Sequence, residues 1–227
     1  MSGWYQPKTA VLLHIYEFRE PNWREAVIGT PKTPGRIPAA VAVALETKAE
    51  LFLVFREEIS SDKETKDETE LTRDTLFSLI DDLREFACSF PVFNHFALGE
   101  IREIMQRIFF ISDEYVARTD DEIRKALPIF KARGIERAVF VSNADHISRI
   151  AQKVCELWEG ELLVATATFR PAPALYSSPQ GSMKDVVVIE PPVVMALGPV
   201  NPRRLLGLRG KPQAIAEIDE ALKRAGV

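Results

Sequence analysis

The chain has 227 residues, of which 46% are hydrophobic and 27% are charged, and its formal net charge is −4 at pH 7. This composition is typical of a folded domain with a substantial core and excludes a chain that is disordered throughout. The acidic balance argues against a surface that is adapted as a whole to nucleic acid, and prolines interrupt the longest apolar stretch before it reaches the ~20 residues that a bilayer requires.

Apolar runs alternate with amphipathic segments in the first half of the chain. Thr9–Tyr16 and Leu51–Phe55 are short apolar runs typical of buried strands. Between them, the loop "GTPKTPGRIP" leads into a helix that carries Pro38 in its first turn. After a charged loop, apolar residues at three- and four-residue spacing from Leu71 to Phe86 predict an amphipathic helix.

The second half continues the same alternation. Thr119 and Glu122 match a capping box, in which a hydroxyl and a carboxylate satisfy each other's free backbone donors, and so predict a helix from Thr119 to Gly134 that is kinked at Pro128. The other predicted elements are a helix at Gly99–Arg107, a strand at Ile108–Ser112, a strand at Arg137–Ser142, a helix at Ala144–Gly160 and a strand at Glu161–Ala167.

Strands that are almost unbroken apolar runs, each followed by a helix, predict βαβ units around a mostly parallel sheet with helices on both faces. We expect a single α/β domain over residues 1–227, with a core at 1–168. Residues 169–227 form a Pro-rich extension packed on that core, with a strand at Asp185–Ile189 and a final helix from about Pro212.

The corner "VSNADHISRI" is the strongest candidate for chemistry. In a parallel α/β sheet, ligands bind beyond the carboxyl ends of the strands, and this strand ends at such a corner. His146 lies on the shoulder of the helix in its first turn, and Arg149 follows nearer to solvent. Free helix N–H groups and Arg149 favour an anion, while Ser142 is either a ligand contact or a nucleophile with His146 as its base. The alternative is helix capping by Ser142 or Asn143, which leaves His146 unexplained.

Three further segments reach the same edge of the predicted sheet. Arg36 beside Gly35 either holds a phosphate or is structural, and Glu70 is either a general base or part of a solvated charge run. Capping alone accounts for Thr119 and Glu122. The sequence has no G-x-G-x-x-G and no Walker motif, and its three histidines are far apart along the chain, so we expect no metal site.

The stretch "AVFVSNADHISRIAQKV" resembles the strand–turn–helix signature of the SanA/YdcF/ElyC-like proteins, a bacterial family of unknown function. His146 and Arg149 match its two charged positions and Ser142 its strand-end hydroxyl. The segment "ARTDDEIRKALPIFKARGIERA" is similar to the family's preceding helix and aligns Thr119 and Glu122 with polar positions, and "GRIPAAVAVAL" aligns Arg36 with the family's first arginine.

This resemblance spans roughly residues 9–166 and implies a Rossmann-like sheet with charged residues over its carboxyl edge. Glu70 corresponds to the family's next acidic residue. The glycine pair that commonly ends the family's first strand is replaced by "HIYEFREP". One branch of the family is associated with S-adenosylmethionine, which makes that cofactor or a nucleotide a possible ligand.

We therefore expect an enzyme that acts on a phosphorylated or nucleotide-like small molecule. The catalytic residues are His146, Glu70 and Glu122, and the ligand-binding residues are Arg36, Ser142, Asn143, Arg149 and Thr119. The alternative is a non-catalytic module that binds an anionic metabolite or S-adenosylmethionine and acts through protein partners. We expect a cytoplasmic location, no membrane or nucleic-acid partner, and a possible homodimer.

Overall fold

A computed structural model describes residues 6–14, 18, 23–57 and 68–174, except for the side chains of Glu57 and Asp145. The strands are β1 (Thr9–Leu13), β2 (Leu51–Glu57), β3 (Phe109–Val116), β4 (Arg137–Asn143) and β5 (Thr168–Ala172). The α-helices are α1 (Trp23–Val27), α2 (Arg36–Thr47), α3 (Glu68–Leu79), α4 (Leu98–Ile108), α5 (Thr119–Ala132), α6 (Ala144–Leu157) and α7 (Leu162–Thr166), and the 3₁₀ helices are η1 (Ile80–Cys88) and η2 (Pro91–Asn94).

The five strands form one parallel sheet in the order β3-β2-β1-β4-β5. From the central strand β1 the chain runs outward through β2 and β3, and it then returns to add β4 and β5 on the other side of β1. The strand order therefore reverses between β1 and β4, which is the point where ligands bind in open α/β sheets.

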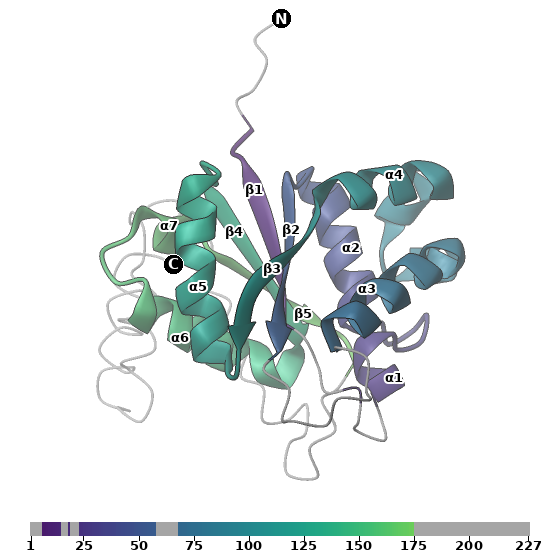
Figure 1. Cartoon of the computed structure of the whole chain (residues 1–227). Helices are drawn as coiled ribbons and strands as arrows, with labels where there is room; N and C mark the ends of the chain where they lie inside the picture. The colour runs from purple at the N-terminus through teal and green to yellow at the C-terminus, as the bar shows by residue number, and fades with distance from the viewer. Residues whose placement is uncertain (1–5, 15–17, 19–22, 58–67, 175–227) are drawn as a thin grey trace, which may run out of the picture. The chain divides into compact units, whose positions relative to one another are not determined.

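Helices cover both faces of the sheet, with α2, α3 and α4 on one side and α5, α6 and α7 on the other (Figure 1). Successive residues of a strand point to opposite faces, and the two hydrophobic cores follow this alternation. Val11 and Leu13 of β1 join the core beneath α2, whereas Ala10 and Leu12 join the core beneath α5 and α6. The predicted α/β class with a Rossmann-like arrangement of layers is confirmed.

The start of α2 is fixed by close packing at Gly35. A Cβ atom at this position would lie 2.5 Å from the backbone carbonyl carbon of Val27, at the end of α1, so a larger residue would push the two segments apart. The helix begins directly afterwards at Arg36, with Pro38 in its first turn as predicted.

Two predicted elements differ in kind or in division from those that form. Residues 161–167 were predicted as a strand, but they contain the short helix α7, and the fifth strand follows at Thr168–Ala172. A short apolar run does not distinguish a strand from a buried helical turn, and here Leu162 is 90% exposed. The predicted division at residues 168/169 therefore falls inside β5. The predicted helix from Leu71 to Phe86 is also divided, into α3 and η1.

The strand predicted at Asp185–Ile189 and the helix predicted from Pro212 lie outside the described residues. Within the described residues, no helix combines the length and the apolar character that crossing a bilayer requires.

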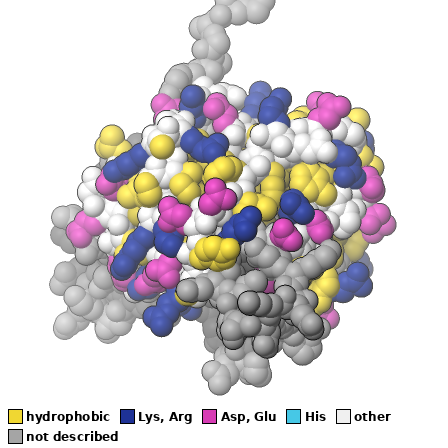
Figure 2. Space-filling model, in the orientation of Figure 1, with side chains coloured by type: hydrophobic (Ala, Val, Ile, Leu, Met, Phe, Trp, Pro, Cys, Tyr) yellow, Lys and Arg dark blue, Asp and Glu magenta, His cyan; other side chains and the backbone are white. Residues whose placement is uncertain are grey.

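The face that carries the edge strand β3 mixes both signs of charge with hydrophobic side chains (Figure 2). Asp113, Glu114 and Tyr115 of β3 are exposed, and the guanidinium of Arg133 lies 4.2 Å from the ring centre of Phe110. Charges on an edge strand oppose pairing with other chains. The coloured part of this view has no uniform basic track of the kind that nucleic acids require.

Removing a side chain from the sheet core should unfold the chain more easily than removing the same side chain from the surface. Leu53 in β2 is completely buried, whereas Leu162 in α7 is 90% exposed. We expect Leu53→Ala to lower the free energy of unfolding by about 2–5 kcal/mol and Leu162→Ala to change it by less than about 0.5 kcal/mol. Urea denaturation measures both values, and similar losses in the two variants would contradict this packing.

Candidate functional site

Polar side chains from three strand–helix connections meet at the carboxyl edge of the sheet, at the reversal between β1 and β4. β1 leads into His14, and β4 ends with Ser142 and Asn143. Helices α2, α5 and α6 begin at the same edge and supply the other members. We call the cluster of Arg36, His14, Glu122, Thr119, Ser142, Asn143 and His146 the switch-point cluster.

Arg36 is the buried cation that joins the two central strands. Its Nε donates a hydrogen bond to Oδ1 of Asn143, and its Nη1 donates to the backbone oxygen of His14 at 2.9 Å. The residue is only 2% exposed, so these bonds replace the water that a guanidinium otherwise binds. Arg36 therefore holds the ends of β1 and β4 together.

Asn143 completes this arrangement from the end of β4. Besides accepting from Arg36, it donates through Nδ2 to the backbone oxygens of Ala26, at 3.2 Å, and Ala174, at 2.9 Å. Its amide groups are thus engaged by protein atoms. Asn143, one of the two candidates for this position, is the N-cap residue of α6, but its side chain makes no capping hydrogen bond.

His14 pairs with Glu122 inside the cluster. His14 Nδ1 donates to Glu122 Oε2 at 2.5 Å, and both residues are buried. The ring also stacks on Phe140, with centroids 6.1 Å apart. Glu122 lies in the first turn of α5, where the helix dipole favours a negative charge. The pair therefore links β1 to α5 through a charge-assisted hydrogen bond.

His146 lies between two hydroxyl groups. Its Nδ1 is 3.0 Å from Ser142 Oγ, and its Nε2 is 3.3 Å from Thr119 Oγ1. A hydroxyl can donate or accept, so the two contacts suit a neutral imidazole, which has one donor and one acceptor nitrogen.

The surroundings of His146 hold its ring neutral. Burial, together with the positive charges of the neighbouring His14, Arg36 and Arg149, lowers the pKa of His146 to about 2. His146 is therefore uncharged at neutral pH, in an environment that favours an anion.

The capping box predicted at the start of α5 is wrong. The N-cap residue is Arg118, and no side chain caps this helix. Thr119 contacts His146 and Glu122 bonds to His14, so both side chains are used inside the cluster. The sequence pattern was correct about the start of the helix but not about what these side chains bind.

The remaining predicted residues differ in how they relate to the cluster. Arg149 is exposed on α6, as predicted, and lies close enough to His146 to affect its pKa. Glu70 lies in the first turn of α3, and no hydrogen bond or ion pair joins it to the described members of the cluster.

His14 is the residue that sequence reasoning missed. The three histidines are far apart along the chain, but the rings of His14 and His146 lie 6.0 Å apart in an edge-on arrangement. The sequence feature that could have identified His14 is its position as a titratable residue directly after a fully buried strand. Within the described part of the chain, no three His, Cys, Asp or Glu residues are grouped so that they could hold a metal ion.

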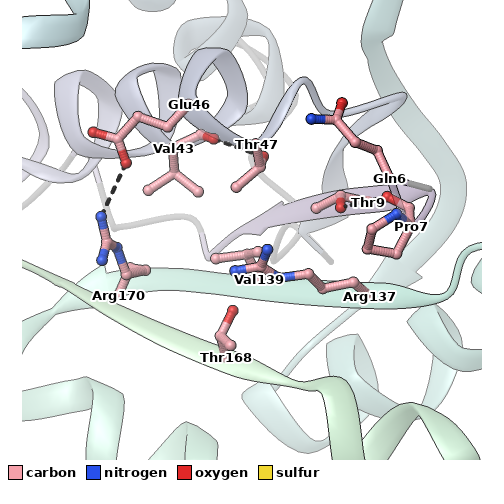
Figure 3. A pocket seen from close by; sticks show the side chains of 10 residues that line it. All are labelled: Gln6, Pro7, Thr9, Val43, Glu46, Thr47, Arg137, Val139, Thr168 and Arg170. Carbon is pink, nitrogen blue, oxygen red and sulfur yellow. Dashed lines mark hydrogen bonds and ion pairs between the residues drawn. The ribbon is translucent and has the colours of Figure 1, made fainter. Parts of the chain in front are cut away.

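A hollow of about 360 Å³ lies at the opposite, amino edge of the sheet (Figure 3). It is bordered by the first residues of β1, β4 and β5 and by the end of α2. Arg170 of β5 pairs with Glu46 of α2 at 3.0 Å beside it. Ligand sites in parallel α/β folds form at the carboxyl edge, so we assign chemistry to the switch-point cluster and not to this hollow.

Asn143 should be important for stability because it satisfies a buried charge. In Asn143→Ala, Arg36 Nε loses its acceptor and two backbone oxygens lose their donor. We expect a loss of at least ~2 kcal/mol in the free energy of unfolding. Asn94→Ala, at an exposed position in η2, is the matched control and should change it by less than ~0.5 kcal/mol. A small effect of Asn143→Ala in urea denaturation would contradict the assigned bonds.

The neutral ring of His146 should make stability depend on pH. Its pKa is about 2 in the folded chain and near 6.5 when unfolded, so between these values the unfolded chain binds more protons. The stability that His146 contributes is therefore present above pH ~6.5 and is lost as the pH falls toward 2. From about pH 7.5 to pH 5, we expect wild type to lose ~2 kcal/mol more than His146→Gln. Denaturation curves at both pH values test this, and equal losses would show that His146 is not held neutral.

Comparison with models of known protein families gives no match, and comparison with curated protein sequences finds no similar chain. The resemblance to the SanA/YdcF/ElyC-like family therefore stays a prediction.

Proposed function

We propose that this chain is an enzyme that acts on a phosphorylated or nucleotide-like small molecule at the switch-point cluster. The observation that supports this most directly is the meeting of two histidines, a buried arginine and a buried glutamate at the sheet reversal. Burying so many titratable groups together costs stability, and such clusters are concentrated at functional sites.

An anion suits the electrostatics of this site. The first N–H groups of α6 have no side-chain cap, and they point toward the carboxyl edge of the sheet. Arg149 is exposed nearby and can offer its guanidinium to a phosphate or carboxylate. Arg36 is buried and held by Asn143 and His14, so we assign it the supporting positive charge and not direct contact with the ligand.

His146 is the proposed acid or base. A bound anion would bring negative charge close to the ring, which raises its pKa toward the range in which an imidazole exchanges protons at neutral pH. Ligand binding and proton acceptance by His146 are thereby coupled. Ser142 Oγ lies 3.0 Å from Nδ1 of His146, so we assign Ser142 to orienting the ring.

S-adenosylmethionine and dinucleotides fit this site poorly. Folds that hold such groups provide glycines after the first strand so that the backbone can approach the ligand. Here β1 is followed by His14, and the next glycine in the sequence is Gly29, in the loop before α2. We therefore propose that side chains of this protein, and not a bound S-adenosylmethionine or dinucleotide, perform the chemistry.

The alternative is a module that binds an anionic metabolite without converting it and acts through protein partners. The burial of Ser142 and the engagement of both His146 nitrogens by protein hydroxyls favour this reading, because neither group is exposed as a nucleophile. A thermal shift with nucleotides in the absence of turnover would support it.

The test is a screen of phosphoesters, nucleotides and nucleotide sugars with wild type, His146→Ala and Arg149→Ala. We expect His146→Ala to reduce kcat by ~10²–10⁴-fold, because it removes the proton acceptor. We expect Arg149→Ala mainly to raise KM, by ~10-fold, because it removes a charged contact to the anion.

Arg107→Ala provides the matched control, since Arg107 is an exposed arginine in the last turn of α4, which leads into the amino end of β3. It should retain wild-type kinetics. Equal activity of wild type and His146→Ala on every substrate that is turned over would remove His146 from the mechanism.

A further inference from the structure

His14 has a hydrogen-bonding arrangement that structural packing does not explain. A buried ring nitrogen normally has a partner, and Nδ1 has one in Glu122. Nε2 of the same ring is also buried, but it has no hydrogen-bond partner among the residues that the structure describes. His14 thus has one nitrogen in a short bond to a carboxylate and the other without an acceptor or donor among the described residues.

Glu122 fixes which nitrogen of His14 is available. A carboxylate can only accept a hydrogen bond, so the Nδ1 atom bonded to it holds a proton. Nε2 is therefore the ring nitrogen that can exchange a proton with a ligand. The carboxylate also stabilises positive charge on the ring when Nε2 is protonated. The stacking on Phe140 and the backbone bonds of His14 to Val141 and Arg36 hold the ring in place.

We propose that His14, oriented by Glu122, is a second proton-transfer group of the site and complements His146. This inference rests on the proposed function. The two rings differ in their partners: His146 is bonded by neutral hydroxyls and His14 by a carboxylate. Because the two rings have different hydrogen-bond partners, we assign them different roles in proton transfer.

The roles follow from these environments. His146, held neutral, accepts the proton of the attacking hydroxyl or water. His14 donates its Nε2 proton to the oxygen that leaves the substrate. Afterwards the proton on His146 passes to solvent and His14 takes one up, so protons balance over the cycle.

The first experiment needs no substrate. Long-range ¹H–¹⁵N spectra of protein labelled in its three histidines report which ring nitrogen carries a proton. We expect Nδ1 of His14 to carry a proton in wild type, with a second proton on Nε2 when the ring is charged. We expect a weaker preference for Nδ1 in Glu122→Gln, because an amide can also donate. A wild-type ring that is protonated only on Nε2 would overturn the proposal.

The second experiment uses a substrate found in the screen and the pH profile of kcat/KM. We expect His14→Gln to lower kcat by ~10²-fold or more and to remove one limb of the profile. Glu122→Gln should lower kcat by ~10-fold or more with little change in KM, and it should shift the same limb. Asp121→Asn is the matched control, because it removes a carboxylate from the same turn of α5 without touching His14, and it should leave the profile unchanged.

The outcomes separate this inference from the proposed function. Turnover with an unchanged pH profile in His14→Gln and Glu122→Gln would overturn the role of His14 and leave the enzyme proposal standing. If no compound is turned over and neither inorganic phosphate nor adenosine 5′-monophosphate shifts the histidine signals, both proposals fail.

Discussion

A buried guanidinium organises the centre of this structure. Arg36 needs hydrogen-bond acceptors because a charge without water is costly, and the acceptors that it finds are the backbone oxygen of His14 and the amide of Asn143. These lie at the ends of β1 and β4, the two strands between which the sheet reverses direction. The same requirement that stabilises the reversal therefore also fixes the backbone from which both histidines project.

Much of the architecture could be predicted because its periodicity is strong. On α6, the stripe formed by Ile147, Ile150, Val154 and Trp158 is buried as its spacing required, whereas Arg149 is exposed. The secondary structure of the region before β5 was harder to predict, since the run "ELLVATA" is short and apolar and suits a strand or a helical turn equally well. The helical turn α7 forms there, and the pairing with β4 begins only at Thr168, a tertiary contact that a single sequence does not display.

The site was predictable only in part, for a related reason. Local geometry brings Ser142 and His146 together, because a strand-end residue and the first turn of the next helix are neighbours along the chain. The bond between His14 and Glu122 joins residues 108 positions apart. Thr119 and Glu122 also have the residue types and spacing of a capping box, so the local explanation concealed the tertiary one.

The position of β5 has a consequence for how the chain can be shortened. β5 pairs with β4 along Val139 to Asn143, and just beyond it the buried Ala174 donates to Pro34 and accepts from Asn143. A fragment that stops before Thr168 would leave the backbone donors and acceptors of β4 open at a new sheet edge. An open hydrophobic edge recruits strands from other molecules, so such a fragment would tend to precipitate.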